Sequence, residues 1–575
     1  MSQRSRPPGR ALSKVACHTL LGVLIASFVA FSLLRGADTY YDLLNIKWYS
    51  GWSILHGNFD LGGIASTRVT QPPVHDVLQV LLNGPNIWWV PPLVNAVVHS
   101  LTTLVVASCC RALLPSANPW AAAVFGGLAL ASPLVLTQLG TSSGHLYSAL
   151  ALAGALRFLL AAQDETPKVY FAGCLLALAV LAKSSTLALL PPLLIGAILI
   201  TGSGSAALSI FSGLATVYGL VTLPWAAFAT LGAGRPISHV WFPGVPRPGL
   251  LPRVGQTYVV VLAVVVVVVG VRRLRRTFED PARSLDERLD RRVFWTLLTM
   301  SLVATFVMSA VVRRTAVDFR FRLESWRELF GRATHTGDLA FGFQTLDLEV
   351  GYFDTRVPIA SSLLVVAMVI FLARGSAESR RISGVLIFCS LPVVLNIWST
   401  GYTRYCIEVL PLLPVAIVAV STHESTSEWI RRAVLGFGAL VLLFPMLPNG
   451  RLSSGVPRLG QVEFVDAIYE PYLSDDEIEM ISDLLPREGL VFGVGSLISY
   501  VAPRINRIDL DWSFERPSRQ EVENLPNEFS IIYQPAESMA LSKYVDRGIL
   551  LERCEVLRFQ YADVGWCSAR VDREV

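Results

Sequence analysis

Long apolar segments alternate with short polar ones over most of the chain. A segment of about 20 apolar residues can cross the hydrocarbon core of a membrane as a helix. Pro191 and Pro192 interrupt one segment and oppose a regular helix there. The pattern predicts about thirteen membrane-spanning helices, at residues 17–35, 88–113, 119–138, 145–163, 169–184, 186–202, 206–231, 254–271, 293–312, 357–373, 382–398, 406–421 and 432–448.

The composition is also typical of a membrane protein. Hydrophobic residues make up 53% of the chain and charged residues 16%, and the mean hydropathy is +0.51. Soluble domains carry about 25% charged residues. The net charge is only +4, and the basic residues form short clusters beside apolar segments. We interpret these clusters as topology signals rather than as a surface for nucleic acid.

The basic clusters predict an orientation in the membrane. The first residues, MSQRSRPPGRALSK, are basic and are expected to stay in the cytoplasm. With the predicted spans, the clusters at 272–276, 373–381 and 428–432 fall on the same side. Arginines in the loop 313–356 fall on the other side, where they either bind an anion or are tolerated because long loops translocate regardless of charge. They are Arg313, Arg314, Arg320, Arg322, Arg327, Arg332 and Arg356.

Three parts are predicted outside the membrane, and they define the domain organisation. Residues 1–448 form the membrane domain with external loops at 36–87 and 313–356, and residues 449–575 form a small extracytoplasmic α/β domain. A helix is expected at SDDEIEMISDLLP, and strands at LVFGVG, FSIIYQP, ILLERCEVLRFQY and WCSARV. Cys554 and Cys567 lie on neighbouring predicted strands, and an oxidising exterior permits them to form a disulfide.

The loop that follows the first span is rich in polar and aromatic residues. Asp38 and Asp42 are four residues apart, so in a helix both face the same way. The aromatic residues around them are typical of a helix that lies in the membrane interface. A carboxylate held there needs a partner or a function. It either pairs with Lys47 or Arg35, or takes part in chemistry.

The arrangement of a first span, an acidic external loop, many more spans and a soluble tail resembles the GT-C superfamily. These are integral membrane glycosyltransferases that use a polyprenyl-phosphate sugar as donor. The loop is similar to Asp-x-Leu-Asn-Tyr-His-x-Tyr-Asn-x-Trp followed by Leu-x-Gly, a pattern of a bacterial GT-C-like group of largely unassigned substrate. The matching residues are Asp42, Leu44, Asn45, Tyr49, Trp52, Leu55 and Gly57.

Shorter similarities to this group lie along the rest of the chain. QPPVHD, ending at Asp76, resembles Asn-Pro-Leu-x-Asp, and LAKSS, with Lys183, resembles a Gly-Leu-Lys segment. GYTRY, with Arg404, resembles Gly-x-x-Arg-Tyr. QLGTSSGH resembles Glu-Leu-Gly-Thr-x-x-x-Asp, but Gln138 and His145 replace its acids. Ile46 and Lys47 likewise replace Tyr-His, so the chain either works with Asp42 and His145 or has lost activity.

The resemblance implies an inverting glycosyltransferase in a bacterial inner membrane. Its donor would be a polyprenyl-phosphate sugar, and its acceptor an envelope glycan, lipid or protein. It implies Asp42 as the catalytic base, with Asp38 second. Cations would hold the donor phosphate, namely Lys183, Arg404, Arg320 and Arg322. Substrate contacts would come from Asn45, Lys47, Tyr49, Asp76, Gln138 and His145.

Two other classes of protein are also consistent with the sequence alone. A transporter or flippase of envelope precursors would have internal repeats and charges at the bilayer midplane, whereas here the polar residues gather at the outer rim. A non-catalytic scaffold with a GT-C-like membrane domain would use its tail to bind partners. No set of metal ligands is evident, although Asp38 and Asp42 could contribute to a divalent metal site.

Overall fold

The structure is a computed structural model, and its description below covers only part of the chain. The described residues are 9–35, 51, 55, 74–83, 89–114, 119–129, 144–162, 165–183, 186–231, 356–374, 376–400, 407–422, 427–443, 475–486, 491–494, 508–510, 526–533, 545, 548–559 and 563–571.

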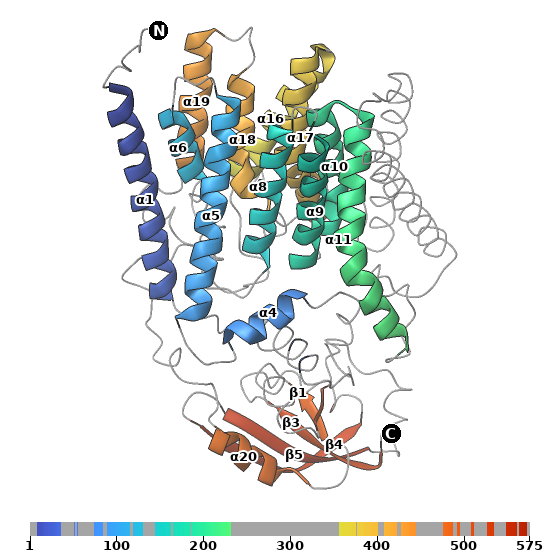
Figure 1. The fold of residues 1–575 in the computed structure, drawn as a ribbon. Coiled ribbons are helices and arrows are strands. Elements are labelled where there is room, and N and C mark those ends of the chain that lie inside the picture. The colour runs from blue at the N-terminus through green and yellow to red at the C-terminus, as the bar shows by residue number, and fades with distance from the viewer. Residues whose placement is uncertain are drawn as a thin grey trace.

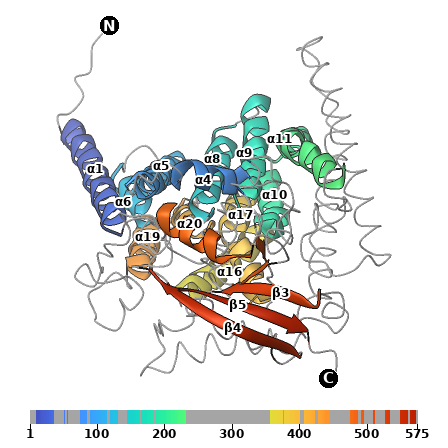
Figure 2. The ribbon, with the colours of Figure 1, turned by 90° about the horizontal axis from the view of Figure 1, so that it is seen from below.

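Most of the described residues are helical and form a bundle (Figure 1). The helices of the bundle are α1 (Gly9–Arg35), α5 (Val90–Leu113), α6 (Pro119–Leu128), α8 (His145–Ala161), α9 (Thr166–Ala182), α10 (Thr186–Thr201), α11 (Gly204–Leu231), α16 (Arg356–Arg374), α17 (Ala377–Thr400), α18 (Leu413–Ser421) and α19 (Glu428–Leu443). A short 3-10 helix, η3 (Leu410–Leu412), leads into α18. A separate short helix, α4 (Val74–Asn83), lies across the ends of α5 and α9 (Figures 1 and 2).

Helices occur at the expected spans, apart from 254–271 and 293–312, which lie outside the described residues. The helix expected at 119–138 ends earlier, at Leu128. α10 continues through Pro191 and Pro192, because neighbouring helices can compensate the lost backbone hydrogen bonds in a membrane bundle. Among the described residues, three helical stretches are long and apolar enough to cross a membrane, namely Val15–Leu33, Val90–Leu113 and Gly204–Pro224. The expected total of about thirteen spans stays a prediction.

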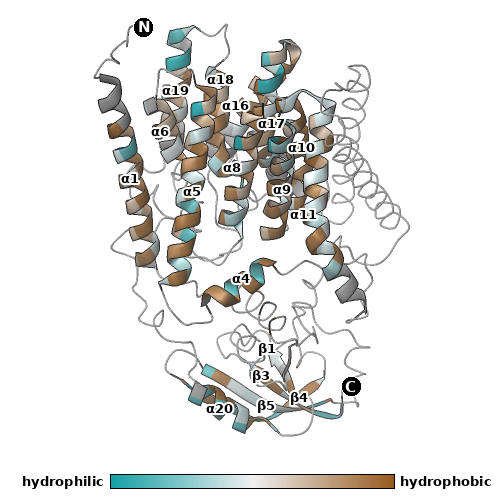
Figure 3. Ribbon diagram, in the orientation of Figure 1, coloured by the Kyte–Doolittle hydropathy of each residue, from teal (hydrophilic) through white to brown (hydrophobic). Residues whose placement is uncertain are grey.

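The bundle has one continuous apolar core, and small residues allow its helices to approach closely. Phe388 of α17 and Leu152 and Leu156 of α8 are fully buried in this core. A Cβ atom at Gly196 of α10 would lie 2.8 Å from the carbonyl oxygen of Gly384 in α17. The two backbones are therefore in contact, as glycines permit in membrane helices. Figure 3 shows that hydrophobic residues dominate the bundle helices.

The tail forms a mixed sheet beyond α4 (Figure 1). Its 5 strands are β1 (Val491–Val494), β2 (Ile508–Leu510), β3 (Glu528–Tyr533), β4 (Ile549–Arg558) and β5 (Asp563–Val571), in the order β2-β1-β3-β5-β4. β1 pairs in parallel with β2 and β3, and β5 pairs antiparallel with β3 and β4. Helix α20 (Asp475–Leu484) precedes β1. The strand β2 is not among the expected elements. That residues 449–575 are a separate domain stays a prediction.

A disulfide joins the two antiparallel strands β4 and β5. Cys554 and Cys567 are paired directly in the register of these strands, and their sulfurs are bonded. The register shifts beside this pair, between Glu552 and Cys554, and Arg553 has a φ of 46°. This is a β-bulge, in which one extra residue is left out of the ladder and the strand bends. The sequence places the same two cysteines on neighbouring strands.

Candidate functional site

Polar side chains gather at the end of the bundle that faces α4 and the sheet (Figure 1). Helices α8 and α10 begin at this end, α9 finishes there, and the chain enters η3 nearby. The positive ends of the α8 and α10 dipoles therefore point toward the same small volume. Anionic groups are stabilised at such helix N-termini.

Glu408 and His145 form a buried pair at this end of the bundle. The Nδ1 atom of His145 lies 2.8 Å from Oε2 of Glu408. Glu408 is 0% exposed and His145 is 6% exposed. A carboxylate can only accept a hydrogen bond, so Nδ1 of His145 carries the hydrogen. This fixes the tautomer of a neutral His145 and leaves Nε2 as the atom that accepts a proton.

Two hydroxyl groups extend this pair into a chain of hydrogen-bonded side chains. Thr186, the first residue of α10, donates from Oγ1 to Oε1 of Glu408 at 3.4 Å. The Oγ of Ser148 lies 3.0 Å from the same Thr186 oxygen. Because the single Thr186 hydrogen is used toward Glu408, Ser148 is the donor in this contact. His145 and Ser148 are one turn apart on α8, so the four side chains hold their elements together.

A second group of polar side chains connects α4 to the bundle. Tyr147 of α8 donates from its hydroxyl to Oδ1 of Asn95 in α5 at 3.2 Å. The ring of His75 in α4 lies edge-on to the Tyr147 ring, with 5.4 Å between their centroids. The Nε2 atoms of His75 and Gln79 are 3.2 Å apart. The contact between the His75 and Tyr147 rings packs α4 against the bundle end, near His145.

Lys183 lies at the same end, on the neighbouring helix α9. It is the C-terminal cap of α9 and is half-buried. A cation is favoured at this position by the negative end of the helix dipole. Gly144, the residue before His145, contacts the backbone of Ala182, and a Cβ at Gly144 would overlap the Ala182 carbonyl oxygen. Because Gly144 has no side chain, the start of α8 can pack against Ala182, the residue before Lys183.

Asp76 lies in the first turn of α4, where a carboxylate is stabilised by the helix dipole. The backbone of Gly51 contacts the Asp76 carbonyl group, because a Cβ at Gly51 would overlap it. Gly51 and Asp76 both belong to the predicted external loop 36–87, which also contains Asp42. The structure therefore brings Asp76, His145 and Lys183 to one end of the bundle, together with one point of that loop.

The other residues that the sequence predicts for the site lie outside the described residues. They are Asp38, Asp42, Asn45, Lys47, Tyr49, Gln138, Arg320, Arg322 and Arg404. Glu408, Thr186 and His75 are absent from the sequence prediction. Glu408 had a signal, because it is an acidic residue within the apolar segment 406–421, and an intramembrane charge is a functional hypothesis by default. Within the described residues, no group of three or more His, Cys, Asp or Glu side chains could hold a metal ion.

Comparisons with known proteins identify the fold. No protein-family model and no curated protein matches the sequence. Among solved structures, the chain is similar to the apo oligosaccharyltransferase of Archaeoglobus fulgidus, with a TM-score of 0.50 and 13% identity over 92% of this chain and 71% of that one. ArnT of Cupriavidus metallidurans in the apo state matches over 96% of this chain and 98% of its own, with a TM-score of 0.41 and 14% identity.

The chain has a GT-C fold. The oligosaccharyltransferase is a GT-C glycosyltransferase, and the similarity to it covers nearly the whole chain. The resemblance in the short sequence motifs is thereby confirmed at the level of the fold. At 13% identity, the similarity carries no substrate or residue role from that protein to this chain.

Proposed function

We propose that the chain is a membrane glycosyltransferase that moves a sugar from a polyprenyl-phosphate donor to an acceptor in the cell envelope. The observation that carries this proposal is the buried His145–Glu408 pair, held with Lys183 and Asp76 at one end of a GT-C fold. An uncompensated carboxylate in a bundle core is costly. Glu408 is instead paired with His145.

The reaction is a substitution at the anomeric carbon of the donor sugar. An acceptor hydroxyl oxygen forms the new bond to this carbon, and the bond from the carbon to the phosphate oxygen breaks. The phosphate leaves with the electron pair, and the hydroxyl proton passes to a carboxylate, for which we propose Asp42 with Asp38 as the second candidate. Attack on the side opposite the phosphate inverts the anomeric carbon.

Cations next to the leaving phosphate stabilise the charge that develops on it. We propose Lys183 for this role, because it is half-buried at the end of α9 beside Gly144 and His145. Arg404, Arg320 and Arg322 are the further candidates from the sequence. Arg404 is four residues before Glu408 in the sequence.

His145 would bind the acceptor, and Glu408 would act through it as a positioning residue. The bond from Nδ1 to Glu408 fixes the orientation of the His145 ring. Asn45, Lys47, Tyr49, Asp76 and Gln138 are proposed as further substrate contacts. A rigidly oriented imidazole places the acceptor without an ordering cost at the moment of reaction.

The charges at the opposite end of the bundle support an orientation in the membrane. Arg111 is in the last turn of α5, and Arg380 and Arg381 follow the start of α17. Lys168 is in the first turn of α9, and Arg432 is near the start of α19. These helix ends lie away from α4 (Figure 1). Basic residues favour the cytoplasmic side, so we propose that α4 and the sheet lie outside the cytoplasm of a bacterial inner membrane.

Mass spectrometry of envelope glycans and lipid-linked sugars tests the proposal. We compare a strain that lacks the protein with strains that express the wild type, Asp42→Asn or Glu428→Gln at matched levels. Glu428 is a control carboxylate at the other end of the bundle, where it pairs with Arg431 and Arg432. We expect one sugar to be missing in the deletion and in Asp42→Asn and present in the other two. Full restoration by Asp42→Asn would favour a scaffold or transport role.

A further inference from the structure

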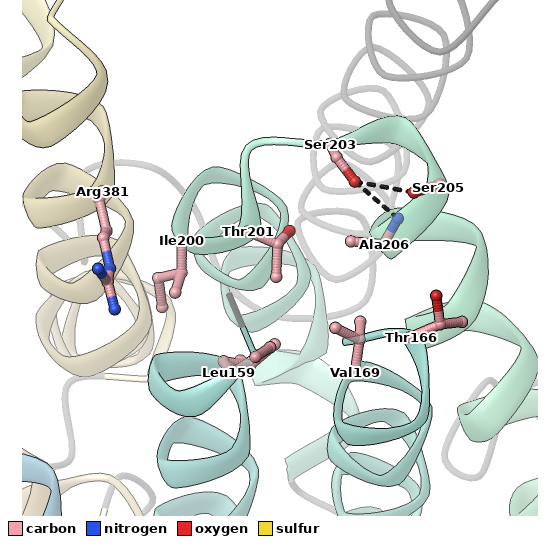
Figure 4. A pocket seen from close by; sticks show the side chains of 10 residues that line it. Leu159, Thr166, Val169, Ile200, Thr201, Ser203, Ser205, Ala206 and Arg381 are labelled. Atoms are coloured by element: carbon pink, nitrogen blue, oxygen red, sulfur yellow. Dashed lines mark hydrogen bonds between the residues drawn. The ribbon is translucent and has the colours of Figure 1, made fainter. Parts of the chain in front are cut away.

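A polar cavity lies at the end of the bundle opposite to His145 and Lys183. Its volume is about 210 Å³. Its walls come from the C-terminal part of α8, the start of α9, the end of α10, the start of α11 and the start of α17. Figure 4 shows the hydroxyl-bearing residues Thr166, Thr201, Ser203 and Ser205 on one side and Arg381 on the other.

Arg381 supplies a cation to this cavity. Its Nη2 atom donates to the carbonyl oxygen of Leu160 at 2.9 Å, which anchors the guanidinium at the end of α8. A guanidinium has five N–H donors, and this bond uses one of them. The side chain is half-buried, so its charge is less screened than that of a fully exposed arginine. The guanidinium is therefore anchored with most of its donors left for other partners.

Two helices begin at the cavity wall opposite Arg381. α9 starts at Thr166 and α11 starts at Gly204, just after Ser203. Ser203 caps α11, because its Oγ accepts a hydrogen bond from the backbone N–H of Ala206 at 3.0 Å. It also lies 3.0 Å from the Oγ of Ser205. The positive ends of the α9 and α11 dipoles therefore face this cavity, as do the negative ends of α8 and α10, which finish at Ala161 and Thr201.

Among the described residues, no acidic side chain lines the cavity. Two described acidic residues, Glu165 and Glu378, are close in sequence to the lining. Glu165, just before α9, pairs with Lys168 at 2.7 Å on the exposed surface. Glu378 lies one turn before Arg381 on α17 but does not line the cavity. An anchored guanidinium and several hydroxyls around one space are features of an anion site.

We infer that this cavity binds a phosphate group. A guanidinium recognises phosphate with two parallel hydrogen bonds, and hydroxyls and helix N-termini complete such sites. The cavity is smaller than the roughly 300–1,000 Å³ of pockets for drug-sized ligands, so it fits a phosphate with a small substituent. The group comes either from an anionic lipid headgroup at that membrane surface or from a soluble phosphate compound. This site is separate from the proposed catalytic end.

Native mass spectrometry of the full chain in detergent tests this inference. The probes are inorganic phosphate, dioleoylphosphatidylglycerol and dioleoylphosphatidylcholine, the last of which has no net charge. The test variant is Arg381→Gln, and the matched control is Arg380→Gln. Arg380 is the adjacent residue, is exposed and does not line the cavity. Ser205→Leu is a second test variant that fills the cavity and leaves the guanidinium unchanged.

We expect Arg381→Gln and Ser205→Leu to bind the anionic probe about tenfold or more weakly, and Arg380→Gln to bind it like the wild type. Loss of phosphatidylglycerol alone would assign a lipid headgroup, and loss of inorganic phosphate as well would assign the phosphate group itself. If Arg381→Gln fails to fold, Ser205→Leu decides the question. The inference is wrong if both anions bind the folded test variants as tightly as they bind Arg380→Gln.

Discussion

The imidazole of His145 and the carboxylate of Glu408 meet at 2.8 Å across a sequence separation of 263 residues. His145 begins α8, and Glu408 lies just before η3, so the pair joins two distant parts of the chain. Each residue is buried. The pair is therefore both a structural connection and the best-defined chemical group at the proposed catalytic end.

Glu408→Ala is expected to destabilise the bundle. The change leaves His145 and Thr186 without their buried acceptor, and breaking a buried pair from one side costs about 3–5 kcal/mol. Thermal unfolding in detergent measures this effect. The matched control is Glu428→Ala, which removes an exposed carboxylate paired with Arg431 and Arg432 and should cost about 1 kcal/mol or less. Equal unfolding midpoints for the two variants would exclude a stabilising role for Glu408.

Glu408→Gln separates positioning from stability. The amide keeps the volume and one acceptor oxygen, so folding should be retained while the tautomer of His145 is no longer fixed. We expect the glycosyl transfer rate to fall by about tenfold or more through kcat rather than KM. His145→Gln should give a similar loss, and the double variant should be no worse than either single variant. Additive losses would mean that the two residues act separately.

Gly144→Ala is expected to weaken the contact between α8 and α9. Its Cβ would overlap the Ala182 carbonyl oxygen, and forcing an atom into a packed position costs about 1–3 kcal/mol. Gly436→Ala is the control, because a Cβ at Gly436 in α19 would meet nothing within 4 Å. A lower unfolding midpoint is expected for Gly144→Ala only. A midpoint at or above the wild-type value for Gly144→Ala would contradict the close contact.

The disulfide between Cys554 and Cys567 should stabilise the sheet of the tail. It closes a loop with a sequence separation of 13, for which the chain-entropy model gives about 3 kcal/mol. Cys554→Ser with Cys567→Ser should therefore make the strands β4 and β5 more sensitive to protease. Cys174→Ser is a control, because Cys174 is a free thiol in α9. Reductant should reproduce the effect in the wild type and add nothing in the double serine variant.

The sequence predicts most of the helical architecture because apolar length is a strong signal. It fails at α6, which ends at Leu128 within the longer apolar segment 119–138. Residues 130–138 of that segment lie outside the described residues. The sequence prediction also misses β2, since Ile508–Leu510 is only three residues long and shows too few residues for a period of two.

The site is harder to predict from the sequence than the helices are, because its residues come from distant segments. Short motifs single out Asp76, His145 and Lys183, and the fold brings all three to one end of the bundle. Glu408 is visible as a lone acid in an apolar segment, but its partner depends on how α8 packs against the turn before η3. Thr186 gives no signal, because a threonine at a helix start is common as a cap.

We propose that the end of the bundle facing α4 holds the donor phosphate. Helix α9 provides a matched test of this proposal, because it has one lysine at each of its ends. Lys183 caps the C-terminal end of this helix, and Lys168 lies in its first turn at the opposite end of the bundle. We would complement the deletion strain with Lys183→Gln or Lys168→Gln and measure the transferred sugar by mass spectrometry. We expect Lys183→Gln to lower the product by about tenfold or more and Lys168→Gln to restore it fully. Full restoration by Lys183→Gln, or equal loss in both variants, would contradict the claim.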